Sequence, residues 1–226
     1  MTYSCALPAT FLTRPNRFVA HVLLDGREVA CHVKNTGRCR ELLLPGAPVW
    51  LCPSDNPNRK TAYDLIAVQK GDLLINMDSQ APNQVFGEWA QLGNFQPNLS
   101  LLRPETRHGS SRFDFYWEAG PRRGFVEVKG VTLEREGGVY FPDAPTQRGV
   151  KHLEELAVCL QEGYEATVCF VIQLARADFF SPNDETHPEF GRTLRDVTRA
   201  GVKVLALSCS VSPASLQIAA PVPILL

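Results

Sequence analysis

Two alternating segments near the start of the chain meet at the dipeptide Asp25-Gly26 and determine the character of its first third. RFVAHVLL (17–24) and REVACHV (27–33) carry apolar residues at every second position, the period of a strand with one buried face. Asp-Gly is favoured in the two-residue turn of a β-hairpin, because both of its residues tolerate positive φ. The sequence therefore predicts an antiparallel hairpin over residues 17–33.

More short strands follow this hairpin. PVWLC (48–52) is one, and TAYDLIAVQ (61–69) and DLLINMD (72–78) form a second pair across Lys70-Gly71. About five short strands in this space suit a closed barrel of the oligonucleotide/oligosaccharide-binding (OB) type better than an open sheet, whose edges stay unprotected. We expect an OB-like β-barrel domain over residues 1–78.

From residue 79 the apolar period changes, which indicates a second domain over residues 79–226. Val85, Trp89 and Leu92 recur at helical spacing, and Gly93 is placed to end that helix. The expected elements then continue as strands at 111–117, 124–134 and 137–142, a helix from Asp143 or Thr146 to Gly163, a strand at 166–174, a helix at 187–201 and a strand at 203–211. The order αβββαβαβ predicts an α/β domain whose last two strands are parallel. The polar segment Arg176–Pro188 is expected to be its most mobile loop.

Charge and cysteine content narrow the function classes. Lys and Arg total 23 against 24 Asp and Glu, so a nucleic-acid partner must be held by local basic patches. The seven cysteines contain no CxxC pair and are expected to be reduced. No apolar run approaches the roughly 18 residues of a membrane span. These features predict a cytoplasmic protein without a membrane partner.

The segment FVEVKGV (125–131) is an apolar strand with Glu127 and Lys129 two positions apart. Alternation places both on one face, and in SRFDFYW (111–117) it places Phe113 and Phe115 together with Asp114 opposite them. Two carboxylates on neighbouring strands, with an ammonium beside them, are what metal-dependent phosphodiester cleavage uses. The alternative is a cross-strand ion pair on a half-exposed face.

Charged residues on the flanking helices are further candidates. Glu88 lies on the first helix, while Arg148, Lys151 and His152 lie near the start of the next one. Cations oppose the dipole at a helix N-terminus, so this basic cluster indicates an anionic partner. The alternatives are a solvent-facing Glu88 and a solvated first turn.

The barrel region has a basic cluster of its own, consisting of Arg14, Arg17, Arg38 and Arg40 around the tripeptide Asn35-Thr36-Gly37. The tripeptide is either a direct phosphate contact or a turn that requires its glycine. His21 and His32 alternate with apolar residues and are interpreted as ordinary barrel residues.

Four motifs, HVKNTGR (32–38), SRFDF (111–115), EVKGVTL (127–133) and FPDAPTQRGVKHLEEL (141–156), resemble the sugar fermentation stimulation protein family over nearly the whole chain. Cys39 departs from the methionine expected after NTGR. The resemblance implies an OB-like barrel, an α/β domain similar to the PD-(D/E)XK (restriction-endonuclease-like) nucleases, and DNA binding. It also implies catalytic residues Asp114, Glu127 and Lys129, and metal ligands Asp114, Glu127 and Glu88.

Together these features predict a nucleic-acid-binding protein with a phosphodiesterase site that depends on Mg²⁺ or Mn²⁺. DNA or another nucleic acid is the expected partner, contacted by Arg38, Arg148, Lys151 and His152. The alternative is a non-catalytic DNA-binding protein that regulates genes of sugar metabolism. The three intact core residues favour catalysis, because carboxylates repel phosphate when no metal is bound.

Overall fold

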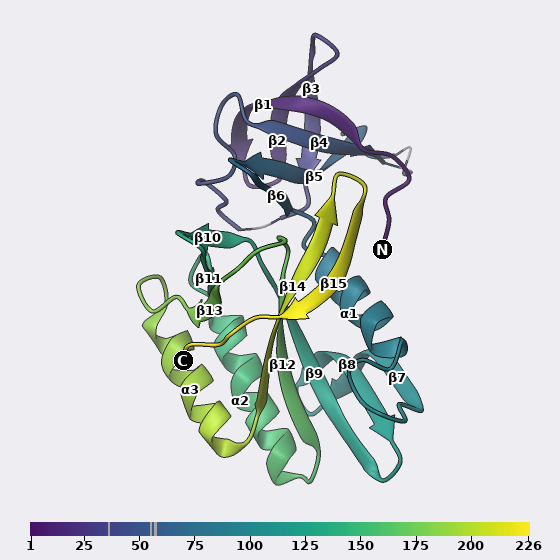
Figure 1. Cartoon of the computed structure of the whole chain (residues 1–226), viewed down its shortest axis with the longest axis vertical. Helices are drawn as coiled ribbons and strands as arrows, with labels where there is room; N and C mark the ends of the chain where they lie inside the picture. Colours follow the sequence, from purple (N-terminus) through teal and green to yellow (C-terminus); the bar gives the residue numbers. More distant parts are fainter. Residues whose placement is uncertain (36, 55, 57) are drawn as a thin grey trace.

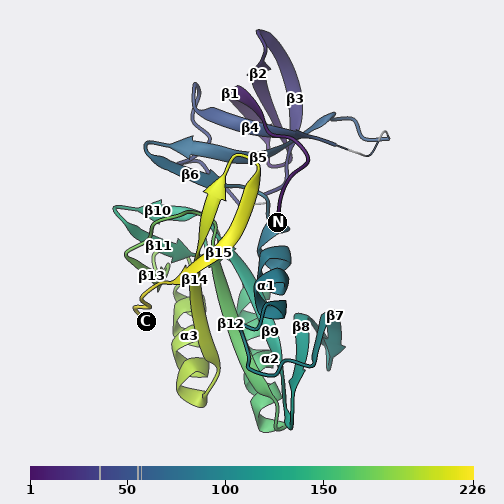
Figure 2. The same cartoon turned by 45° about the vertical axis from the view of Figure 1, so that its right-hand side comes forward.

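The computed structural model describes residues 1–35, 37–54, 56 and 58–226. Figures 1 and 2 show a β-barrel at one end of the long axis and a larger α/β unit at the other. The hairpin of β14 and β15 reaches from the α/β unit towards the barrel.

The first unit is the expected OB barrel. Its strands are β1 (Leu7–Asn16), β2 (Val19–Leu24), β3 (Arg27–Val33), β4 (Pro48–Pro53), β5 (Tyr63–Lys70) and β6 (Leu73–Asn76). They pair in the order β3-β2-β1-β4-β5-β6, and a parallel pairing of β3 with β5 closes the barrel. The predicted hairpin is confirmed, with φ of 50° at Asp25 and 76° at Gly26. Sequence reasoning missed β1, whose prolines and uneven apolar spacing obscure the strand pattern.

The second unit is the expected α/β domain. Its helices are α1 (Ala81–Gln91), α2 (Gln147–Gln161) and α3 (Pro188–Ala200). Its strands are β7 (Leu101–His108), β8 (Ser111–Ala119), β9 (Arg122–Val131), β10 (Leu133–Arg135), β11 (Gly138–Phe141), β12 (Glu165–Ile172), β13 (Phe179–Pro182), β14 (Lys203–Ser212) and β15 (Ser215–Pro221). The main sheet has the order β15-β14-β12-β9-β8-β7, and β12 runs parallel to both β9 and β14 as predicted for the last pair.

The helices cover opposite faces of this sheet, with α1 on one side and α2 and α3 on the other (Figure 2). Thr146 caps α2, because its hydroxyl accepts a hydrogen bond from the Gly149 amide at 3.0 Å. Helix α2 packs against β9, the strand that carries Glu127 and Lys129. The residues near the start of α2 can therefore reach that strand.

Several details of the prediction are wrong. Leu92 is 80% exposed instead of buried, since α1 ends at Gln91 and packs through Val85, Phe86 and Ala90. The segment expected to be a mobile loop contains β13, which pairs with β11. Strands β7 and β15 were not expected, and they widen the sheet at its two edges.

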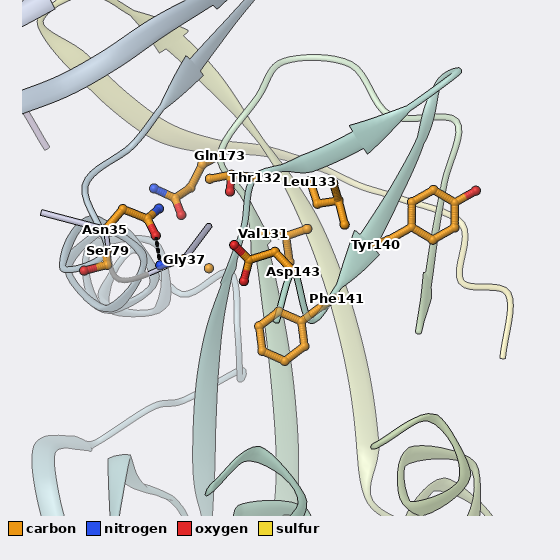
Figure 3. A pocket seen from close by; sticks show the side chains of 11 residues that line it. Asn35, Gly37, Ser79, Val131, Thr132, Leu133, Tyr140, Phe141, Asp143 and Gln173 are labelled. Carbon is orange, nitrogen blue, oxygen red and sulfur yellow. Dashed lines mark hydrogen bonds between the residues drawn. The ribbon is translucent and has the colours of Figure 1, made fainter. Parts of the chain in front are cut away.

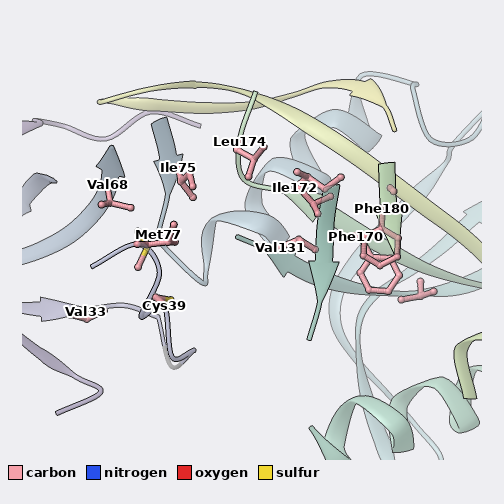
Figure 4. Close-up of a cluster of buried hydrophobic side chains, with 14 of the residues drawn as sticks. Val33, Cys39, Val68, Ile75, Met77, Val131, Phe170, Ile172, Leu174 and Phe180 are labelled. Carbon is pink, nitrogen blue, oxygen red and sulfur yellow. The ribbon is translucent and has the colours of Figure 1, made fainter. Parts of the chain in front are cut away.

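One hydrophobic cluster runs from the barrel into the α/β unit (Figure 4). The barrel supplies residues such as Ile75 and Met77, and the α/β unit supplies Val131, Ile172 and Leu174. The two units are therefore packed against each other through a shared core. The domain boundary expected between residues 78 and 79 stays a prediction. Among the described residues, no helix has the length and apolar character needed to cross a membrane.

Candidate functional site

The site forms where the pairing of β8 with β9 comes to an end. The described register runs from Ala119–Arg122 to Phe115–Val126 and stops before Asp114. Beyond that point the Asp114 side chain replaces the backbone pairing, because its Oδ2 accepts a hydrogen bond from the Val128 amide at 2.7 Å. Asp114 is thus fixed to the residue that lies between Glu127 and Lys129.

The same irregularity overturns one expectation from strand alternation. Phe113 and Phe115 were expected on one face, but Phe113 packs against Phe125 (5.1 Å between ring centroids) and Phe115 packs against Phe86 (5.3 Å). These two contacts belong to the clusters on opposite sides of the sheet. The side chains of β8 therefore switch faces of the sheet at Asp114, where the backbone pairing with β9 ends.

Glu127 and Lys129 share one face of β9, as alternation predicts. The Lys129 ammonium donates to Glu127 Oε1 at 2.5 Å, and His152 Nδ1 on α2 is hydrogen-bonded to the same oxygen. Glu127 is only 3% exposed. It is therefore a buried, ion-paired carboxylate and not part of a solvated face.

The two carboxylates have pKa values shifted in opposite directions. Burial, reinforced by the charge of Glu127, raises the pKa of Asp114 to about 6. Burial also acts to raise the pKa of Glu127, but His152 and Lys129 outweigh it and hold that pKa below its ordinary value. Carboxylates whose pKa values are pushed apart in this way are frequent at functional sites.

The donor set fits a hard divalent cation in part. Glu127 Oε2 is buried without a hydrogen-bond partner in the described residues, which leaves a negative oxygen free to coordinate a cation. Mg²⁺ typically binds through one or two carboxylates and keeps several waters. Within the described chain, no group of three or more His, Cys, Asp and Glu residues has the geometry of a complete metal site.

Glu88 lies near Asp114 but has other partners. Both residues line a pocket of about 300 Å³ beside α1. Glu88 Oε2 accepts from the Met1 amino group at 2.6 Å, and its Oε1 accepts from Gln84 at 3.0 Å. The hydrogen bond between α1 and Asp114 comes instead from Asn83, whose amide donates to Asp114 Oδ1 at 2.7 Å.

The basic residues of α2 do not form one surface. Arg148 and Lys151 are exposed, and Lys151 lies 3.6 Å from Glu155. His152 is 6% exposed, so the expectation that it contacts nucleic acid is corrected. Its position in the helix could have shown this, because it belongs to the buried stripe that includes Leu153 and Leu156.

The barrel presents a basic groove of about 690 Å³, with Phe11, Leu43 and Pro45 among its lining residues. Arg17, Arg38 and Arg40 are exposed along it. Arg14 has a different role from the others, because its guanidinium donates to the backbone carbonyls of Arg17, Asn35 and Arg38. Arg14 therefore links the turn between β1 and β2, which carries Arg17, to the loop after β3, which carries Arg38 and Arg40.

The loop after β3 meets the α/β unit at Asp143 (Figure 3). Asn35 Oδ1 accepts from the Gly37 amide at 2.8 Å, which forms a turn, while Thr36 lies outside the described residues. A Cβ on Gly37 would overlap Asp143 Oδ2. Glycine is thus required here for the close approach of Asp143, which also accepts from the Arg38 amide at 3.0 Å.

The pocket at this junction includes Gly130 and Val131, which directly follow Lys129. Asn35 and Gly37 reach it from the barrel. The barrel loop and the end of β9 therefore border one cavity.

An OB barrel followed by an α/β domain with a buried carboxylate pair defines the class of this protein, and comparison with known proteins agrees. The model "SfsA N-terminal OB domain" matches residues 12–77, and "Sugar fermentation stimulation protein RE domain" matches residues 80–215. The chain belongs to the sugar fermentation stimulation protein family.

Relatives of similar length support this membership. A "Sugar fermentation stimulation protein homolog" of Desulfitobacterium hafniense is 56% identical, over 96% of this chain and 95% of the relative. One from Clostridium beijerinckii is 53% identical, over 96% of each chain. A solved structure, "The structure of Pyrococcus Furiosus SfsA in complex with Ca2+", is similar with a TM-score of 0.91 and 26% identity, over 100% of this chain and 98% of that one.

Proposed function

We propose that the chain is a nucleic-acid-binding phosphodiesterase of PD-(D/E)XK type that depends on a divalent cation, Mg²⁺ or Mn²⁺. The observation that carries the proposal is the arrangement of three residues at the opening of the sheet. Asp114 is bonded to the Val128 amide, and Glu127 and Lys129 flank that amide on either side. The unpartnered Oε2 of Glu127 supplies a free ligand atom.

Each residue has a role that follows from its chemistry. Asp114 and Glu127 would hold the cation, which polarises the phosphodiester and activates water when it is bound. Lys129, with its ammonium on Glu127 Oε1, would stabilise negative charge that develops on the phosphate. The Pyrococcus furiosus protein was solved in complex with Ca²⁺, which supports this reading because Ca²⁺ and Mg²⁺ both prefer oxygen ligands.

The barrel would hold the nucleic acid. The exposed arginines of its groove are suited to phosphate, and the apolar lining of the groove is suited to bases. Ala144, just before α2, lines the same groove. A strand bound there would therefore run towards the end of α2 that carries Arg148. A cytoplasmic location is part of this proposal.

A second function, DNA binding without catalysis in the regulation of sugar-metabolism genes, is favoured by a specific observation. The Lys129 ammonium already neutralises Glu127, and the described residues do not complete a metal site. In a protein that only binds, the buried pair would stabilise the fold without a cation.

The test is incubation of the full chain with labelled single-stranded, duplex and branched DNA and RNA in Mg²⁺, Mn²⁺ or EDTA. The enzyme predicts cleavage that EDTA abolishes. Lys129→Ala should remove cleavage while metal and DNA affinity change little, and Asp114→Ala should lose metal binding. Loss of the Asp114 charge should also tighten DNA binding in the absence of metal. Equal DNA binding with metal or EDTA, and no cleavage of any substrate, would leave the non-catalytic function.

A further inference from the structure

His152 connects the surface of α2 to the buried carboxylate of β9. Its Nε2 lies 3.3 Å from Arg148 Nε, and its Nδ1 is hydrogen-bonded to Glu127 Oε1. An arginine can only donate, so Nε2 is the acceptor. The Lys129 ammonium also lies 3.4 Å from Nδ1, but the contact of Nδ1 with the Glu127 carboxylate is the shorter one, which places the proton of a neutral imidazole on Nδ1. Arg148 thereby sets the tautomer in which His152 donates to Glu127.

The consequence for Glu127 is an asymmetric carboxylate. Oε1 accepts from both His152 and Lys129, whereas the buried Oε2 has no partner among the described residues. The imidazole is itself buried and packed within α2, so it holds Oε1 in a fixed place. Fixing one oxygen also fixes the other.

We infer that His152 is a positioning residue, which orients Glu127 so that Oε2 is presented to the divalent cation. Arg148 supports it by holding its ring in the donating tautomer. Partners of this kind, one shell outside the metal, orient carboxylate and histidine ligands in many metal sites. The inference rests on the proposed metal-dependent function, and it gives His152 and Arg148 a task distinct from contact with nucleic acid.

The competing explanation is that His152 only fills the core beside α2. Three substitutions separate these roles, because they differ in where they place a donor. Asparagine can place an amide nitrogen near the position of Nδ1, glutamine reaches towards Nε2 instead, and leucine fills the space without any donor. If His152 positions Glu127, the Mn²⁺ affinity of the variants should follow whether the new side chain can donate to Glu127. If His152 only packs, the affinity should follow the volume and apolar character of the new side chain.

The experiment measures Mn²⁺ affinity of the full chain by isothermal titration calorimetry, for wild type and for His152→Asn, His152→Gln and His152→Leu. Circular dichroism confirms folding of each. We expect His152→Leu to weaken Mn²⁺ binding about 10- to 100-fold, and His152→Asn to recover most of that loss. Should His152→Leu fail to fold, tighter binding by the asparagine variant than by the glutamine variant carries the same information.

The matched control is His108→Leu. His108 is also a histidine paired with a glutamate, since its Nε2 lies 2.5 Å from Glu162 Oε2, but it belongs to β7 at the edge of the sheet. Its loss should leave Mn²⁺ affinity unchanged. Arg148→Met should weaken binding by a smaller factor than His152→Leu, because it frees the tautomer without removing the donor.

Two results would overturn the inference and leave the metal site intact. One is wild-type affinity in both His152→Leu and His152→Asn. The other is an equal loss in the asparagine, glutamine and leucine variants, which would assign His152 to packing. Failure of the wild-type protein to bind Mn²⁺ is a different result, because it would refute the proposed function itself.

Discussion

Asp114→Asn is expected to stabilise the metal-free protein while it removes metal binding. The carboxylate is buried beside Glu127, which raises its pKa from 3.8 to about 6. An amide at this position keeps an oxygen that can accept from Val128, and the Asn83 amide can turn to present its own oxygen. The variant therefore loses a buried charge and keeps the hydrogen bonds.

The magnitude follows from the shift in pKa. The folded protein keeps the Asp114 proton up to about pH 6, whereas the unfolded chain releases it near pH 3.8. Between these values the folded state binds more protons, so the wild-type free energy of unfolding falls as the pH rises. Well above pH 6 the ionised Asp114 lowers the free energy of unfolding by about 3 kcal/mol, and below both pKa values this destabilisation vanishes.

The assay is urea unfolding in EDTA at pH 5 and pH 8. The free energy of unfolding of Asp114→Asn should exceed that of wild type at both pH values, by a margin about 1.4 kcal/mol larger at pH 8. Asp196→Asn, which changes an exposed carboxylate on α3, is the control and should show no such dependence. A variant less stable than wild type at pH 8, or an advantage independent of pH, would refute the assigned burial and charge of Asp114.

Three further predictions concern the site, the barrel and the sheet. The Mn²⁺ affinity of the wild type should fall as the pH is lowered through about 6, because a proton then competes with the cation for Asp114. Calorimetry across pH 5 to 8 measures this affinity, and an affinity that does not change with pH would exclude Asp114 as a ligand. Arg38→Glu should weaken nucleic-acid binding about equally for all sequences and flatten its salt dependence, as measured by fluorescence anisotropy at several KCl concentrations, whereas Arg199→Glu on α3 should not. Gly124→Ala should lower the free energy of unfolding, measured in urea, by about 1–3 kcal/mol, because the added Cβ would overlap the Glu165 carbonyl oxygen. Gly87→Ala is the control and should lower it much less, because a Cβ there meets Phe115 only at 3.4 Å.

The parts of the fold that were predictable are those encoded by local pattern. Asp25-Gly26 identified its hairpin, and alternation in FVEVKGV placed Glu127 and Lys129 together. Strand β7 was missed because Arg103, Pro104 and Glu105 interrupt its apolar pattern, and its pairing with β8 compensates only in the folded chain. Propensity is overridden in such cases by tertiary contacts.

The missed features of the site have the same origin. Nothing local to SRFDF shows that the ladder opens at Asp114, because the opening depends on the Val128 amide and on Asn83 from α1. His152 was assigned to the surface from its place near the helix start, although its spacing from Leu153 and Leu156 could have predicted that it is buried. Only the packing of α2 against β9 shows that it faces Glu127.

The near-neutral charge of the chain is compatible with nucleic-acid binding because its cations are unevenly paired. Arg59, Arg122 and Arg195 are each bound to a carboxylate, at Asp64, Glu165 and Asp184. By contrast, Arg17, Arg38 and Arg40 form no ion pair within the part of the chain that the structure describes.

These unpaired arginines all line the barrel groove, and the groove borders Ala144 next to α2. Three exposed arginines are therefore gathered in one groove although the total charge is close to zero, which gives a nucleic acid a local site of positive potential. In the proposed function, a phosphate backbone held in the groove would bring its own negative charge towards the carboxylates of Asp114 and Glu127. Catalysis would consequently require a cation to offset that repulsion, whereas binding alone would require only that the nucleic acid stay within the groove.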